Sequence, residues 1–194
     1  MAGMIAACRR RHGVAKWPGH LPADFTGGRS LTMATTARNT GAAAAVAAGI
    51  AAAATMAAPL EGYRSYVYRD PIGVLTYCYG ETQNAKDMVG RKFSEEECRA
   101  LLTKRMAHYE QGNAKCVANY EQLHVYVQTA FNDFSYNLGN GAFCKSTAAK
   151  YLRAGNIKAA CLEMGKFVYA GGKKLGGLVK RRALEQMYCL KGSH

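Results

Sequence analysis

Acidic residues are scarce in this chain, in which 13 Asp and Glu stand against 26 Lys and Arg among 194 residues. The surplus of positive charge extends along the whole chain: residues 1–58 hold six Lys and Arg against one Asp, and residues 59–194 hold twenty against twelve. Such a basic protein is attracted to polyanions, which include nucleic acids, cell-wall polymers and anionic membranes. The sequence has no helix-turn-helix, zinc-finger or RNA-binding signature, so we do not expect a nucleic-acid partner.

Metal-binding and phosphate-binding motifs are missing as well. No two of the seven cysteines form a C-x-x-C pair, and none of the five histidines pairs with another at metal-ligand spacing, so the common zinc-site patterns are excluded. The chain also has no G-x-x-x-x-G-K-[ST] phosphate loop. We therefore expect neither a metal site nor an organic cofactor.

Six of the cysteines fall within residues 59–194. An even number of cysteines in an exported domain indicates disulfides, whereas a domain kept in the cytosol would hold them reduced. Spacing alone does not choose among the many possible pairings. We favour Cys161 with Cys189, because each lies on a predicted C-terminal helix. The other four are Cys78, Cys98, Cys116 and Cys144.

Charge is absent between Arg38 and Glu61, and within that gap residues 41–58 hold twelve alanines among eighteen positions. As a helix, eighteen residues span about 27 Å, close to the thickness of the hydrocarbon core of a membrane. Alanine is only marginally apolar, so the segment should enter a bilayer weakly. Arg38 before it predicts a cytoplasmic N-terminus, with Glu61 on the outer side.

Residues 1–32 contain three consecutive arginines and the single tryptophan, Trp17, and show neither a helical nor a strand period. We interpret them as an irregular basic leader that is not translated from the native gene, with Met33 as the true start. The alternative is a genuine disordered leader.

Two carboxylates and a hydroxyl follow the alanine-rich segment, in EGYRSYVYRDPIGVLTYCYGET. Residues 60–68 predict a short helix and residues 75–79 a strand. Glu61 and Asp70 are nine residues apart, and Thr76 comes six residues later on the predicted strand. Two carboxylates that meet across a cleft are what glycosidic hydrolysis needs.

The pattern E-G, Y-x-D-x-x-G and T-x-x-Y-G-x-T in this segment resembles the catalytic signature of phage-type lysozymes, the endolysins that cut peptidoglycan. The resemblance implies that Glu61 is the general acid, that Asp70 stays ionised to activate water or stabilise the cationic sugar, and that Thr76 helps to hold the water. Many relatives carry His where this chain has Glu81, so a local stabilising pair should differ.

The rest of the chain predicts a mainly helical domain. Ser94 with Glu97 forms a capping box for a helix to about residue 111, Asn119 is expected to cap a helix over 120–138, and Asn156 a later helix. The resemblance suggests three substrate-binding residues: Asn137, Tyr169 and Arg181. For Arg181 and Arg182 we keep open a solvated basic face or a structural pair with Glu185.

Three interpretations of residues 33–58 remain. The first is a signal-anchor-release segment, as in a subgroup of phage endolysins. These enter the inner membrane through the secretion machinery, stay tethered and inactive there, and then leave it, so the expected partners of residues 33–58 are that membrane and that machinery. The second is a signal peptide cleaved at residues 52–54. The third is a flexible linker or a soluble core helix.

The length and the resemblance together predict an α+β lysozyme-like fold in residues 59–194, with a mostly helical large lobe and a small lobe that carries a short β-hairpin. The expected protein is a monomer. It would hydrolyse the β-1,4 bond between N-acetylmuramic acid and N-acetylglucosamine for host-cell lysis, first at the inner membrane and then in the periplasm of a Gram-negative host. The alternatives are a lytic transglycosylase and a cationic protein that disrupts membranes or walls.

Overall fold

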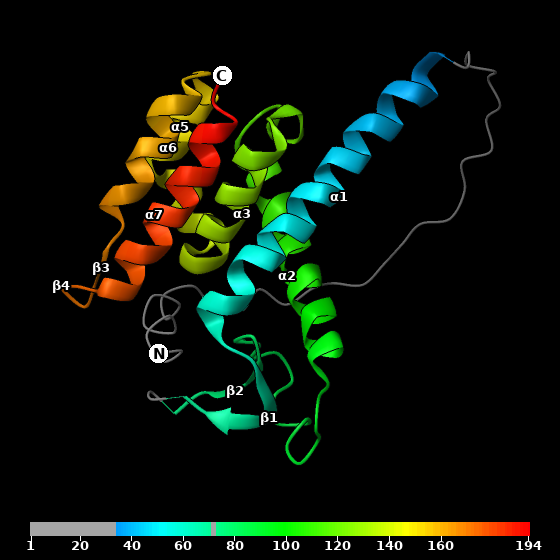
Figure 1. Cartoon of the computed structure of the whole chain (residues 1–194), viewed down its shortest axis with the longest axis vertical. Coiled ribbons are helices and arrows are strands. Elements are labelled where there is room, and N and C mark those ends of the chain that lie inside the picture. The colour runs from blue at the N-terminus through cyan, green and yellow to red at the C-terminus, as the bar shows by residue number, and fades with distance from the viewer. Residues whose placement is uncertain (1–33, 71–72) are drawn as a thin grey trace, which may run out of the picture.

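The computed structural model describes residues 34–70 and 73–194, in a small β lobe below a larger helical lobe (Figure 1). The proposed leader, residues 1–32, lies outside the described residues. The small lobe holds strands β1 (Arg64–Arg69) and β2 (Leu75–Cys78), which pair antiparallel. The strand predicted over 75–79 is therefore confirmed.

The helix predicted over residues 60–68 is wrong. Helix α1 (Ala34–Glu61) ends where that helix was expected to begin. Gly62 then adopts a φ of +78°, which stops the helix. The sequence RSYVYR that follows is rich in β-branched and aromatic residues and forms β1.

The helical lobe begins with α2 (Glu95–Cys116), whose N-terminus has the predicted capping box of Ser94 and Glu97. The helix runs beyond the expected end near residue 111. Asn119 does not cap the next helix as predicted, because it lies in the left-handed region with a φ of 60° and makes no side-chain cap bond. The predicted helix is instead divided into η3 (Tyr120–Gln122) and α3 (Val125–Leu138), which His124 caps.

Helix α3 is the centre of this lobe, with α1 and α2 on one side and α7 on the other (Figure 1). Asn156 accepts a hydrogen bond from the Ala159 N–H and caps α6 as predicted. The remaining elements are α4 (Asn140–Lys145), α5 (Thr147–Arg153), α6 (Ile157–Glu163), η4 (Met164–Lys166), β3 (Tyr169–Ala170), β4 (Lys173–Lys174) and α7 (Gly176–Lys191).

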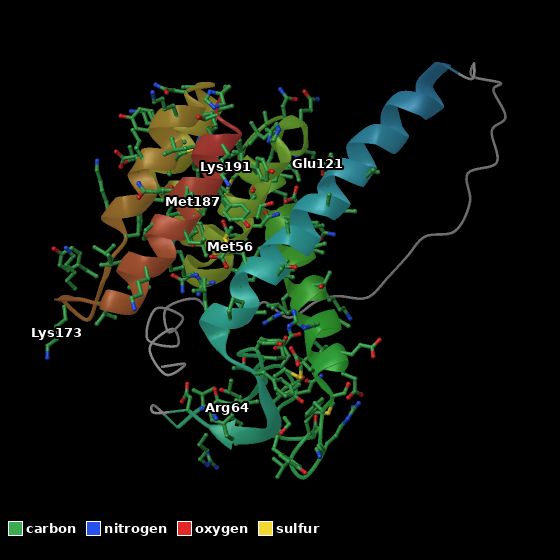
Figure 2. The ribbon with its side chains drawn as sticks, in the orientation of Figure 1. Met56, Arg64, Glu121, Lys173, Met187 and Lys191 are labelled. Carbon is green, nitrogen blue, oxygen red and sulfur yellow. A yellow bond between two sulfur atoms is a disulfide. The ribbon has the colours of Figure 1, made fainter. Side chains whose placement is uncertain are left out.

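Helix α1 is one continuous helix that passes from solvent into the core. Ala53 and Ala57 are fully buried in a cluster with residues of α2 and the small lobe, and Met56 lies where α1 passes α3 (Figure 2). The opposite half projects beyond the other helices (Figure 1), and Ala43 and Ala47 there are exposed. The domain boundary predicted between residues 58 and 59 thus falls inside one helix.

Three disulfides connect the elements of the fold. Cys78–Cys98 joins the small lobe to α2, Cys116–Cys144 joins the end of α2 to α4, and Cys161–Cys189 joins α6 to α7. The favoured pairing of Cys161 with Cys189 is confirmed, and all six domain cysteines are bonded.

Candidate active site

Glu61 is the last residue of α1, and its side chain is only 5% exposed. Its Oε1 accepts a hydrogen bond of 2.7 Å from Arg181 Nη1 on α7. Its Oε2 lies beside Gly80, in the turn that follows β2. A Cβ atom added to Gly80 would be 3.6 Å from this oxygen. Glu61 therefore stands where the helical lobe meets the small lobe.

Asp70 and Thr76 lie on the β1–β2 hairpin. Asp70 follows β1, and its Oδ1 accepts a 2.7 Å hydrogen bond from the Val74 N–H. The Asp70 carbonyl accepts a further bond from the Gly73 N–H, and the φ of +84° at Gly73 allows this tight turn. Thr76 pairs with Tyr68 in the sheet register, and its hydroxyl donates to the Val74 carbonyl. The hairpin thus fixes the carboxylate and the hydroxyl relative to each other.

The Tyr68 phenol on β1 is influenced by the charges of both Glu61 and Asp70. Burial raises the pKa of the Tyr68 phenol, the Arg64 charge lowers it, and the negative charges of Asp70 and Glu61 raise it further. Both predicted carboxylates thus act electrostatically on one residue of β1. Glu61 precedes this strand and Asp70 follows it, so the hairpin links the two predicted residues.

Arg181 links Glu61 to the interior of the helical lobe and is 3% exposed. Its Nε and Nη2 donate to the two carboxylate oxygens of Asp133 at 2.9 and 2.7 Å, and Glu185 Oε1 lies 3.6 Å from its Nε. Arg182 Nη1 lies 3.1 Å from Glu185 Oε2. The alternative of a structural pairing with Glu185 is confirmed for both arginines.

The other two expected substrate-binding residues lie in different settings. Asn137 is half-buried and accepts a 2.6 Å hydrogen bond from Arg182 Nη2. Tyr169 is 62% exposed on β3. The β3–β4 hairpin stands out from the body of the protein, with Lys173 at its tip (Figure 2).

Glu81, at the position of the frequent histidine, fastens the small lobe to α2. Its Oε1 accepts from the Thr82 and Gln83 N–H groups at 2.8 Å each, and its Oε2 lies 3.0 Å from Arg105 Nε. A different stabilising pair is thus present, as expected. A small pocket lies between this turn and α2, but Glu61 is not among its lining residues.

Asp133 is the residue at this site that the sequence analysis missed. It is fully buried on α3, within the run FNDF. A single acidic residue inside an apolar helix was the available signal, because a buried charge requires a partner. Among residues 34–70 and 73–194, no group of three or more His, Cys, Asp or Glu is placed to hold a metal ion.

Comparison with known proteins places this site in a family. The phage lysozyme family model matches residues 58–185. The SAR-endolysin of Bacteriophage PS119 is 40% identical over 136 residues, which cover 69% of this chain and 78% of that protein. The SAR-endolysin of Enterobacteria phage P21 is 37% identical over 136 residues, which cover 69% of this chain and 79% of that protein.

Solved structures agree on the fold. The active form of the P1 phage endolysin Lyz superposes with a TM-score of 0.65 at 22% identity, covering 86% of this chain and 97% of that chain. A P22 lysozyme mutant superposes with a TM-score of 0.64 at 26% identity, covering 71% and 94%. The expected lysozyme-like α+β fold is confirmed, and the chain belongs to the phage lysozyme family.

Proposed function

We propose that this chain is a phage endolysin, a glycoside hydrolase that cuts the β-1,4 bond between N-acetylmuramic acid and N-acetylglucosamine in bacterial peptidoglycan during host-cell lysis. Family membership and the SAR-endolysin relatives support this activity. The observation that carries it is the placement of Glu61, buried at the end of α1, directly before the hairpin that holds Asp70 and Thr76. Two carboxylates at such a junction suit glycosidic cleavage.

In this proposal Glu61 protonates the glycosidic oxygen, and its near-complete burial suits a group that must hold a proton before the bond breaks. Asp70 acts as the ionised partner that activates water or stabilises the cationic sugar. Thr76 helps to hold the water. The hydrogen bonds of the hairpin turn orient Asp70 and Thr76.

The three expected substrate-binding residues take different roles in the proposal. Tyr169 is exposed and offers its ring to a sugar or to a wall peptide. Arg181 and Asn137 contact protein groups, so they support the site through Glu61 and Arg182. The net charge of +13 draws the enzyme to the anionic cell wall.

Glu61→Gln in the full chain tests the catalytic proposal. We expect hydrolysis of purified peptidoglycan to fall by at least about a hundredfold, the usual contribution of a general acid. Glu97→Gln is the matched control, because this exposed glutamate sits in a capping box that accepts glutamine equally well. Equal lysis by Glu61→Gln and wild type would instead identify a cationic disrupting protein.

The mass of the product distinguishes a lysozyme-type hydrolase from a lytic transglycosylase. A hydrolase adds one water across the cleaved bond, whereas a lytic transglycosylase releases an anhydro sugar that is lighter by that water. We expect the hydrated product. An anhydro product would replace the lysozyme assignment with the transglycosylase.

The proposed location is the inner membrane first and the periplasm after release. One helix among the described residues, over Ala43–Glu61, is long and apolar enough to span a membrane, and 33% of that window is buried in the folded protein. Because Ala53 and Ala57 fill the core, a helix held in the bilayer is unable to complete it. Release would therefore assemble the site around Glu61.

Reaction at the wall requires no second copy, so we propose a monomer.

Burial of α1 favours release of an intact helix over the other interpretations. Cleavage at residues 52–54 would remove Ala53 or Ala54, both of which are in the core. Ala43 and Ala47 are exposed, so the first half of α1 is not part of the core of the folded protein. The SAR-endolysin names of the relatives support the same proposal.

A further inference from the structure

Five charged side chains form a buried cluster behind the proposed active site. None of them is more than 5% exposed. The members of this charge cluster are Glu61 from α1, Asp133 from α3, and Arg181, Arg182 and Glu185 from α7. Three helices far apart in the sequence thus each contribute at least one charge to one site.

The contacts divide the cluster into two ion pairs, Asp133 with Arg181 and Glu185 with Arg182, and a third carboxyl group, that of Glu61. Asp133 holds Arg181 with two hydrogen bonds, in a bidentate arrangement. Glu185 lies against both arginines, closer to Arg182. Glu61 is the remaining carboxyl and contacts Arg181 through one oxygen.

The charges of the cluster do not cancel when every group is ionised. Three carboxylates face two guanidinium groups, and a guanidinium does not lose its proton in a protein. An uncompensated buried charge is costly, so the cluster favours keeping one proton. With that proton on Glu61, Asp133 neutralises Arg181 and Glu185 neutralises Arg182.

This arrangement solves a difficulty for a general acid. An arginine next to a carboxyl favours the ionised form, which has no proton to donate. Here the charge of Arg181 is already opposed by Asp133, and Glu185 adds a second negative charge nearby. Burial is the main cause that raises the pKa of Glu185, and the charge of Arg182 opposes that rise. Glu185 is therefore the rival site for the retained proton.

We propose that Asp133 and Glu185 are positioning residues for the acid: they hold Arg181 at Glu61 and supply the surplus negative charge that keeps one proton available to Glu61 at neutral pH. The inference rests on the general-acid role proposed above for Glu61. It requires the retained proton to reach Glu61, because with the proton fixed on Glu185 the cluster is already neutral with Glu61 ionised, and Glu185→Gln would leave that balance unchanged.

Other groups around the cluster also act on its titration. Arg181 stacks over Tyr136 of α3, with 5.8 Å between the guanidinium carbon and the ring centroid. Arg182 lies in the same way over Phe134 and donates to Asn137. Outside the cluster, the Tyr136 hydroxyl of α3 and Glu61 Oε2 both lie near Gly80, and the charges of Glu61 and Asp70 both act on the Tyr68 phenol of β1.

The test is the pH profile of kcat/KM for peptidoglycan hydrolysis by full-length Glu185→Gln. The glutamine keeps the shape of the side chain but removes its charge, so the cluster becomes neutral with Glu61 ionised. We expect the alkaline limb of the profile to move to lower pH by about one unit or more. Glu110→Gln is the matched control, since Glu110 is equally buried but lies on α2, and it should keep the wild-type limb.

An alkaline limb that stays at the wild-type position in folded Glu185→Gln would overturn the proposal. If that variant does not fold, infrared spectroscopy of the Glu110→Gln protein at pH 8 gives the answer, because the substitution removes the other carboxyl that titrates near neutrality. The band of a protonated carboxylic acid should persist there, and its absence would refute a retained proton.

The two proposals fail in different ways. Full activity of Glu61→Gln would refute the general-acid role of Glu61. An inactive Glu61→Gln together with an unshifted alkaline limb in Glu185→Gln would support that role and refute only the positioning role of Asp133 and Glu185.

Discussion

Glu110 shows how a single buried carboxyl makes stability depend on pH. It lies on α2, 2% exposed, and its Oε2 accepts a hydrogen bond from Asn132 Nδ2. Its Oε1 has no hydrogen-bond partner among the described residues. Burial raises its pKa from 4.5 to about 7, and the Asn132 hydrogen bond only partly offsets this.

The raised pKa means that the folded protein binds more protons than the unfolded chain between pH 4.5 and 7. The contribution of Glu110 to stability is therefore complete below pH 4.5 and is lost as pH rises towards 7. Glu110→Gln removes this loss, and its oxygen still accepts from Asn132. We expect the difference in free energy of unfolding between the variant and wild type to grow by about 3 kcal/mol in favour of the variant between pH 4.5 and 7.5.

Urea unfolding of both proteins across that pH range measures the difference. Glu97→Gln, an exposed site, should show no comparable gain. A constant difference between Glu110→Gln and wild type at every pH would show that Glu110 has the same pKa in both states.

At the scale of single residues, local spacing was enough to propose those candidates that lie within one short segment. Glu61, Asp70 and Thr76 lie close along the chain, and turn residues such as Gly73 mark how the hairpin presents them. Asp133 and the role of Arg181 were not accessible in this way, because 120 positions separate Arg181 from Glu61.

At the scale of an element, the proposed release from the membrane would place two requirements on α1. Its alanines must be small enough to pack closely against α2 and α3, and weakly apolar enough to leave a bilayer. The close approach is visible at Gly49, where a Cβ would come within 3.1 Å of the buried Gln128 side chain. A more apolar sequence would anchor better but would pack worse.

Ala57→Leu tests this double requirement, with Ala47→Leu as its control. Both changes raise the hydrophobicity of the helix equally, but Ala57 is fully buried and Ala47 is exposed in the released fold. Overpacking should lower the stability of the released enzyme by about 1–3 kcal/mol for Ala57→Leu alone. The soluble fraction after membrane separation and its denaturant midpoint measure both effects.

We expect less released and less active protein for Ala57→Leu than for Ala47→Leu. Equal release and equal stability of the two variants would mean that packing of α1 does not drive its exit from the membrane. Higher retention of both variants by the same amount would assign the effect to hydrophobicity alone.

Local patterns predicted some elements and failed at others. The capping box of Ser94 was read correctly, because the motif acts within four residues. The expected helix over 60–68 was wrong because Gly62 ends α1 and the following residues pair with β2 instead. Hydrogen bonding between β1 and β2 thus outweighed the weak helical tendency of residues 60–68.

For the whole molecule, the three disulfides distribute cross-links over both lobes. Their sequence separations are 20, 28 and 28 residues. Cross-links of this span stabilise mainly by restricting the unfolded chain, by about 3 kcal/mol each. The enzyme should therefore be most stable after export to an oxidising compartment.

Replacing Cys161 and Cys189 together by alanine should lower the free energy of unfolding by about 3 kcal/mol, with the other two disulfides intact. Guanidinium unfolding without reductant measures the change. Wild type in reductant serves as the comparison and should lose more than the double variant. A double variant as stable as wild type would contradict a stabilising role for this bond.

The sequence by itself determined the family signature, strand β2, the capped start of α2 and the uncharged, alanine-rich character of α1. Each of these depends on spacing within one segment, so local rules suffice. Only the tertiary structure decided that the alanines of α1 fill the core, that Cys78 pairs with Cys98, and that Asp133, Arg181 and Glu185 surround Glu61. These contacts join distant parts of the chain, and they form only when the packing of α1, α3 and α7 brings those helices together.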